Sequence, residues 1–312
     1  MMKKLIFSLI LTSGILLILE GLALKYNSTT EFLLPDPDEL WKQPQGSRIE
    51  HGVRVRINSL GLRGAELLPK NTLRIATVGD SSVFGFLVEE EDIFSTQIVT
   101  KLKESSLSIE HINGAAPGHS TYQSLNRLRW LLPETNPDLL IIGNLWSDSA
   151  LAGFQDSELY HSNSFVFLTK SALFRYLVSV FSPQKHTNIR WHARPNNTTD
   201  ISPRVSLKEY QTNLFKMHKL AKKYNCKVVF LALYLEEELA GAPEDLANKY
   251  RTVMQSVASS TGSSLWDAQE AWNGKTDLFA DFLHPNANGH KKLGLYFAPH
   301  TQQLLDDIKS NH

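Results

Sequence analysis

Apolar residues along this chain follow two patterns. Short continuous apolar runs are typical of strands buried on both faces of a parallel sheet, whereas apolar positions three or four residues apart are typical of amphipathic helices. The predicted strands lie at residues 73–79, 107–113, 137–143, 227–233 and 264–266. Because helical segments alternate with these strands, we expect right-handed crossovers and an α/β fold, with a five-stranded parallel sheet covered by helices on both faces.

The segments between the strands carry helical stripes of apolar residues. The predicted helices begin near Phe94, Thr121, Leu207, Leu246 and Asn286. Gly262 is suited to end the fourth helix, because glycine readily adopts the left-handed conformation found there. Pro299 is expected to interrupt the last helix, because its nitrogen carries no hydrogen.

The N-terminus has a different pattern. Residues 5–24 are apolar almost throughout, with Glu20 inside the run and Lys3 and Lys4 before it. Twenty helical residues span about 30 Å, the thickness of the hydrocarbon core of a bilayer. We therefore expect residues 1–25 to form a transmembrane anchor, with the remaining chain exported to the periplasmic or extracellular side. Secretion after cleavage of a signal peptide is the alternative.

The remaining chain divides into a collar and one large domain. Residues 26–70 are rich in proline and glycine and are expected to form an extended collar or linker, with short strands near residues 53–57. Residues 71–310 form the main domain. An irregular aromatic stretch at about 149–204 interrupts it, and we interpret this stretch as an insertion that forms a lid, a substrate wall or a cap with its own small core.

Composition excludes several classes of function. Lys and Arg together number 32, as do Asp and Glu, so no net charge favours nucleic acid. Cys226 is the single cysteine and cannot form an internal disulfide. The histidines show no metal-ligand spacing, and no glycine fingerprint for a nucleotide is present, so we expect neither a metal nor an organic cofactor.

Two short segments carry candidate chemistry. The first strand runs into Gly79-Asp80-Ser81, which places Ser81 at the carboxyl edge of the sheet and at the start of a helix. There its hydroxyl is exposed to a substrate, and its backbone N–H has no helical partner. Near the other end, Asp281 and His284 lie three residues apart, ahead of the last helix. A hydroxyl nucleophile needs such a base and an orienting carboxylate.

These two segments resemble blocks of a known family. Gly79-Asp80-Ser81-Ser82 is similar to the first block, and Asp281-Phe282-Leu283-His284 to the last block, of the SGNH (GDSL-type) hydrolases, here of the membrane-anchored bacterial type. The resemblance covers about residues 73–308. It implies a flavodoxin-like three-layer α/β/α sandwich and a serine esterase with Ser81 as nucleophile, His284 as base and Asp281 as its orienting carboxylate.

The resemblance also implies an oxyanion hole. Its donors in the family are the backbone N–H of the nucleophilic serine, a glycine N–H from the second block and an asparagine side chain from the third. Ser81 supplies the first donor, and Gly118 is the best match for the glycine, with Gly114 as the alternative.

The third block departs from the family pattern. The family usually has Gly-X-Asn-Asp, whereas residues 143–148 here are Gly-Asn-Leu-Trp-Ser-Asp. Counting without gaps places Ser147 at the asparagine position. A serine hydroxyl can donate one hydrogen bond. The alternative is a rebuilt loop in which Asn144 donates.

The leading functional hypothesis is hydrolysis of an ester, with an acyl or acetyl group on a lipid or a carbohydrate. One alternative is O-acyl transfer to a surface glycan through the same acyl-enzyme. The other is a catalytically inactive module that binds a ligand, which the altered third block would fit. The expected partners are the ester substrate and, through the N-terminal helix, a membrane.

Overall fold

A computed structural model describes most of the chain, and its central feature is a parallel sheet. The described residues are 2–27, 33–36, 38–70, 72–105, 107–162, 171–173, 177, 201–241 and 245–310. Five parallel strands follow the order β11-β10-β7-β5-β6. They are β5 (Leu73–Gly79), β6 (Ile109–Asn113), β7 (Leu139–Gly143), β10 (Lys227–Ala232) and β11 (Ser264–Asp267). The predicted five-stranded parallel sheet is therefore confirmed.

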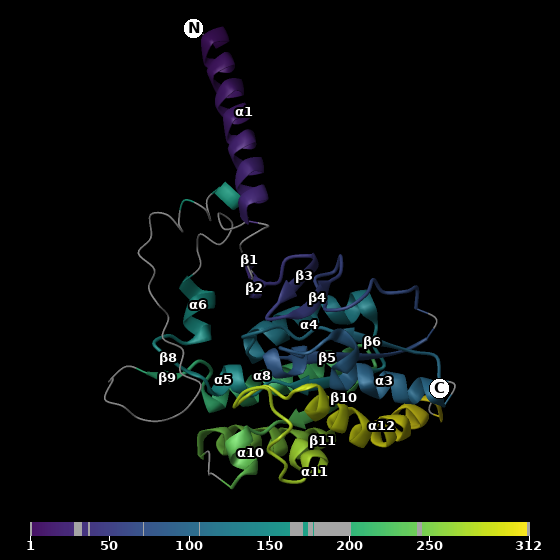
Figure 1. The fold of residues 1–312 in the computed structure, drawn as a ribbon. Coiled ribbons are helices and arrows are strands. Elements are labelled where there is room, and N and C mark those ends of the chain that lie inside the picture. Colours follow the sequence, from purple (N-terminus) through teal and green to yellow (C-terminus); the bar gives the residue numbers. More distant parts are fainter. Residues whose placement is uncertain are drawn as a thin grey trace.

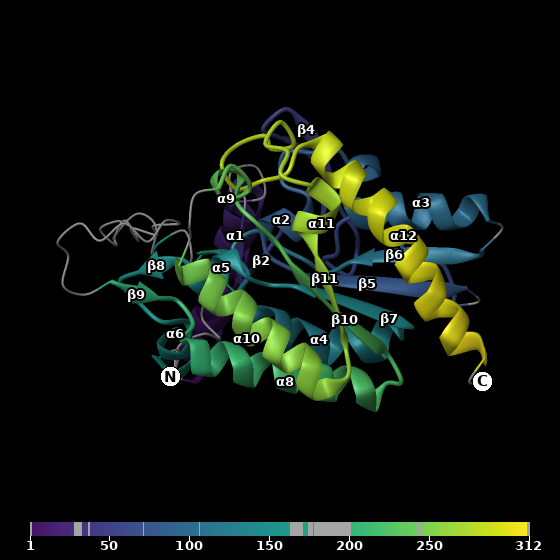
Figure 2. The ribbon, with the colours of Figure 1, turned by 90° about the horizontal axis from the view of Figure 1, so that it is seen from below.

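Helices cover both faces of this sheet. On one face α3 (Phe94–Glu104) and α12 (Ala287–Ser310) lie side by side, and the other face is covered by α4 (Thr121–Thr135), α8 (Leu207–Lys223) and α10 (Asp245–Thr261) (Figures 1 and 2). The three layers agree with the predicted α/β/α sandwich. The chain order reverses between β5 and β7, which is where open α/β sheets bind ligands.

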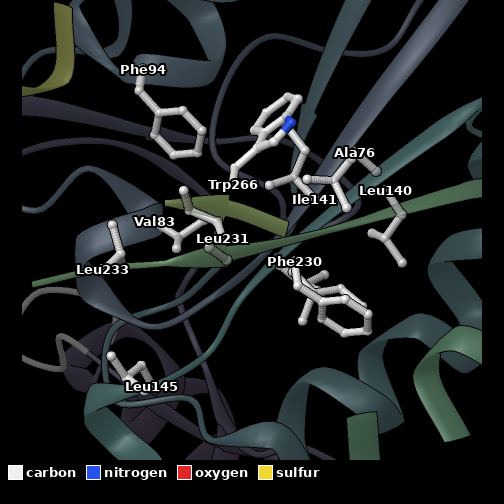
Figure 3. Close-up of a cluster of buried hydrophobic side chains, with 14 of the residues drawn as sticks. Ala76, Val83, Phe94, Leu140, Ile141, Leu145, Phe230, Leu231, Leu233 and Trp266 are labelled. Atoms are coloured by element: carbon white, nitrogen blue, oxygen red, sulfur yellow. The ribbon is translucent and has the colours of Figure 1, made fainter. Parts of the chain in front are cut away.

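The core follows the alternation of side chains along the strands. Leu140 faces the same side of the sheet as its register neighbour Ala76, whereas Ile141 faces the opposite side. On the side of α12, the Trp266 ring stacks on Phe297 with 4.6 Å between the ring centroids. Figure 3 shows Phe230 on one side of the strands and Trp266 on the other. Because both faces are buried, the strands need continuous apolar sequences rather than alternating ones.

The last helix differs from the prediction. It runs without interruption from Ala287 to Ser310 and contains Pro299. Proline removes one donor to the carbonyl four residues earlier, here that of Leu295. The helix packs against α3, and this packing outweighs the loss of one hydrogen bond.

The collar is folded onto the main domain. Its first hairpin pairs β1 (Leu34–Asp36) with β2 (Leu40–Lys42), and its second pairs β3 (Gly46–Glu50) with β4 (Val53–Ile57). The strand predicted near residues 53–57 is confirmed. Bridges from Ile57 to Arg63 and from Arg63 to Asn113 join the second hairpin to the edge strand β6.

The N-terminal segment forms α1 (Met2–Asn27), which extends away from the sheet (Figure 1). Ser8, Thr12, Ser13 and Glu20 interrupt its apolar sequence. Within the part of the chain that the structure describes, no helix is both long enough and apolar enough to cross a membrane. The predicted transmembrane helix is therefore not supported.

The predicted insertion is described only in part. It contains β8 (Leu151–Ala152), α6 (Asp156–Ser162) and β9 (Ser202–Pro203), with α5 (Trp146–Ser149) at its start. Residues 163–170, 174–176 and 178–200 lie outside the described residues. The interpretation of this stretch as a lid, wall or cap stays a prediction.

Candidate active site

The Gly-Asp-Ser turn places Ser81 at the sheet edge. Ser81 is the first residue of α2 (Ser81–Phe84), and Asp80 caps this helix by accepting a hydrogen bond from Ser82 N (3.1 Å). The helix lies close against the strand ends because glycines occupy the paired positions 79 and 143. A Cβ atom on Gly143 would lie 2.5 Å from Val83 Cγ2, closer than atoms pack.

The predicted histidine and aspartate meet Ser81 in space, although about 200 residues separate them from it. His284 Nε2 lies 2.8 Å from Ser81 Oγ, and His284 Nδ1 lies 2.8 Å from Asp281 Oδ2. This geometry fits an Nδ1–H that donates to the carboxylate and an Nε2 that accepts from the serine hydroxyl. The sequence prediction that Ser81, Asp281 and His284 come together agrees with this geometry.

Local hydrogen bonds orient the carboxylate of Asp281. Its Oδ1 accepts from the backbone N–H groups of Leu283 (2.8 Å) and His284 (2.7 Å), while Oδ2 faces the imidazole. Partial burial alone would raise the pKa of Asp281, but hydrogen bonds from His284 and from the two backbone N–H groups lower it to about 2. Asp281 is therefore ionised at neutral pH and holds the imidazole in one orientation.

Two backbone N–H groups are available as oxyanion donors. Neither Ser81 N nor Gly118 N donates to any of the described residues. Gly114 N, in contrast, donates to Thr77 O (2.8 Å). Of the two glycines considered from the sequence, Gly118 is therefore the one with a free donor.

Asp80 links the third block, residues 143–148, to the Gly79-Asp80-Ser81 turn. The Oδ2 atom of Asp80 accepts from Trp146 N (2.9 Å) and, at 3.4 Å, from Ser147 N. The hydroxyl of Ser147 is buried and has no partner among the described residues, so it is free to donate. Asn144 Nδ2 already donates to the carbonyl of His119 (3.2 Å).

Two residues that support the site were not assigned a role from the sequence. One is Asp80, which the sequence analysis names only as part of a motif, although an aspartate directly before a helix is a signal for an N-cap.

The other is Arg63. It donates to the carbonyls at the end of α2, those of Phe84 (3.0 Å) and Gly85 (2.5 Å). Burial lowers the pKa of Arg63 to about 10. No local sequence signal connects Arg63 with these two carbonyls, which lie 21 and 22 residues later.

Aromatic side chains border the histidine. The ring of Phe86 lies 4.8 Å from the imidazole of His284, measured between centroids. Phe282, between the two residues of the Asp-His pair, is 41% exposed. An aromatic ring, that of Phe86, therefore lies directly beside the imidazole.

Comparison with known proteins establishes a likeness of fold. No family model matches the sequence, and no curated protein matches it significantly. Among solved structures, the chain is similar to TesA, with a TM-score of 0.51 and 18% identity over 74% of this chain and 99% of TesA. It is also similar to the psychrotrophic esterase EstA from Pseudoalteromonas sp., with a TM-score of 0.50 and 16% identity over 75% and 98% of the two chains.

A third similar structure is LAE5, an α/β hydrolase enzyme from the metagenome of Lake Arreo in Spain. Its TM-score is 0.50 at 15% identity, over 75% of this chain and 96% of LAE5. In all three cases nearly the whole of the other protein is covered. At these identities the likeness establishes the fold alone.

Proposed function

We propose that this protein is a serine esterase of the SGNH (GDSL) type. The observation that carries the proposal is the continuous hydrogen-bonded series from Ser81 Oγ through His284 to Asp281, with 2.8 Å at each step. A module that only binds a ligand needs no such series. The likeness of fold to EstA, which is described as an esterase, adds support.

In the first step, Ser81 Oγ bonds to the carbonyl carbon of the ester while its proton passes to His284 Nε2. The carbonyl oxygen becomes an oxyanion. When the bond to the alcohol breaks, His284 returns the proton to the leaving oxygen, and an acyl-enzyme remains. Asp281 stabilises the imidazolium without taking its proton.

In the second step, water gives a proton to His284 Nε2 and attacks the acyl carbon. The bond to Ser81 Oγ breaks, Oγ recovers the proton, and the acid leaves. We assign the oxyanion to Ser81 N, Gly118 N and the hydroxyl of Ser147, because each lacks a partner among the described residues. Loss of one such donor typically costs roughly 10²–10³ in rate.

We propose an acyl or acetyl ester of a lipid or a carbohydrate as the substrate. The exposed Phe282 and the ring of Phe86 beside His284 support a substrate with an apolar portion. The reaction as written uses only groups of this chain and water.

Labelling with a fluorophosphonate probe tests the proposal, because the probe reacts with an activated serine whatever the natural substrate. We expect labelling of the wild-type protein and loss of labelling in Ser81→Ala and His284→Ala. Ser82→Ala is the matched control, since Ser82 Oγ donates only to Leu283 O (3.4 Å) and lies outside the series. A folded wild-type protein that is not labelled would refute the proposal.

We further propose that the domain acts outside the cytoplasm. The support is the N-terminal apolar run at residues 5–24 behind Lys3 and Lys4, which anchors and signal peptides share. Cell fractionation followed by N-terminal sequencing tests this, with an intact N-terminus expected for a retained protein and a shortened one for a secreted protein. Recovery of the intact chain from the cytoplasm would contradict it.

A further inference from the structure

The first collar hairpin, β1–β2, lies against the loop that carries Gly118. Trp41 Nε1 donates to the carbonyl of Pro117 (3.0 Å), and the Trp41 carbonyl lies 3.0 Å from His119 Nε2. A Cβ atom on Gly118 would lie 3.1 Å from Trp41 Cζ2. One tryptophan therefore contacts three consecutive residues of the loop.

The bond from Trp41 fixes the direction of a specific N–H group. The Pro117 carbonyl and the Gly118 N–H belong to one peptide unit, which is planar and trans, so the two groups point in opposite directions. Holding the carbonyl toward the indole therefore holds the Gly118 N–H away from it. The φ angle of Gly118 is +77°, a conformation in which glycine is not otherwise restricted. A backbone hydrogen bond from His119 N to Ala116 O (3.1 Å) closes a turn around this unit, and the bond from Trp41 adds an external restraint on its orientation.

The far side of the same residue is also held. Arg204 Nη1 donates to the Gly118 carbonyl (2.9 Å), and Arg204 itself is fully buried in an ion pair with Asp156. Trp41 thus holds the peptide unit before Gly118, and Arg204 holds the one after it. Rotation of either peptide unit is therefore restricted.

Buried contacts attach the hairpin itself to the domain. Glu39 is 4% exposed and pairs with Arg127, which also donates to the Gly114 carbonyl (2.9 Å). Trp130 Nε1 donates to Glu39 Oε1 (2.7 Å). The hairpin thus contacts the Gly118 loop directly through Trp41 and the loop's first residue through Arg127.

We propose that Trp41 is a positioning residue for the oxyanion hole: its indole N–H orients the peptide unit whose N–H, at Gly118, stabilises the oxyanion. The proposal rests on the proposed esterase function. It makes the collar a part of the active site rather than a spacer in front of it.

The test is Trp41→Phe in the full chain, which keeps an aromatic ring and removes the N–H. We expect kcat for p-nitrophenyl acetate to fall by about tenfold, with KM within about twofold of the wild-type value. Complete loss of an oxyanion donor typically lowers kcat by roughly 10²–10³-fold, and a donor that only points in the wrong direction should cause a smaller decrease. A trifluoromethyl ketone, whose adduct with Ser81 carries an oxyanion, should lose affinity by the same factor as kcat/KM.

Trp130→Phe is the matched control, because it removes another indole N–H bond to the same hairpin without touching the loop. We expect it to change kcat by less than about twofold while lowering the melting temperature as much as Trp41→Phe does. Equal effects of both variants on kcat, or an unchanged ketone affinity in Trp41→Phe, would overturn the proposal and leave the esterase assignment in place. A wild-type protein without activity or labelling would overturn both.

Discussion

At the scale of single residues, the hydrogen bonds to Asp281 set the charge of its carboxyl group. It accepts three hydrogen bonds, one from the imidazole of His284 and two from backbone N–H groups, and these favour its ionised form. Partial burial opposes ionisation, yet the net effect lowers its pKa from 3.8 to about 2. Since the side chain of Asp281 is 35% exposed, solvent reaches the carboxylate and moderates each interaction.

The lowered pKa predicts how stability depends on pH. A carboxyl group whose pKa is lower in the folded state contributes stability that is complete above its ordinary pKa and is lost as pH falls through the folded value. We expect the wild-type protein to be more stable than Asp281→Asn at about pH 5, with the difference shrinking between about pH 4 and pH 2. Urea unfolding of both proteins across this range measures it. A difference that grew on acidification would contradict the lowered pKa.

At the scale of elements, the packing of α2 against the ends of β5 and β7 determines where Ser81 lies. The helix has only four residues, Ser81 to Phe84, so its own hydrogen bonds give it little stability. Its position comes from Val83, which packs against Gly143 at the end of β7, and from Arg63 at its last carbonyls. Asp80 then links this helix to the start of α5.

This packing predicts a strong effect of one methyl group. Gly143→Ala would place Cβ 2.5 Å from Val83 Cγ2, and we expect a loss of about 1–3 kcal/mol in the free energy of unfolding, as for other overpacked sites. Adding Val83→Ala should recover part of this loss, with a coupling of at least about 0.5 kcal/mol in a double-mutant cycle.

Gly153→Ala provides the control for Gly143→Ala, because nothing lies within 4 Å of its added Cβ. Its effect should stay within about 0.5 kcal/mol. Urea unfolding of the single variants and the double variant gives all the values. If the effects of Gly143→Ala and Val83→Ala on the free energy of unfolding were strictly additive, the two sites would not be in contact.

At the scale of the whole molecule, the sheet gathers four loops at one edge. The loops after β5, β6 and β7 bring Ser81, Gly118 and Ser147, and the loop before α12 brings Asp281 and His284. The order of the strands places β5 between β6 and β7, so the segment that carries Ser81 lies between those that carry the candidate donors Gly118 and Ser147. The collar then adds Trp41 from the N-terminal side of the chain.

The sequence alone determined the layered fold and the three residues of the Ser-His-Asp series. Strands buried on both faces require continuous apolar runs, which are visible in the sequence. Ser81 and the Asp281–His284 pair each lie in a short segment whose conformation depends on neighbouring residues. The predicted interruption at Pro299 is wrong, because the packing of α12 on α3 outweighs the local preference of proline.

Only the tertiary structure decided which of the candidate donors are left without a partner among the described residues. The sequence favoured Gly118 over Gly114 only by spacing, whereas the structure separates them because Gly114 N donates to Thr77 O across the β5–β6 pair. Asn144 and Ser147 differ because the Asn144 amide donates to the His119 carbonyl while the Ser147 hydroxyl stays unpaired among the residues described. Trp41 lies 76 residues from Pro117, the residue it holds. Hydrogen bonds between distant segments leave no periodic signal in the sequence, so the pairing of these candidate donors and the contact from Trp41 are visible only in the folded chain.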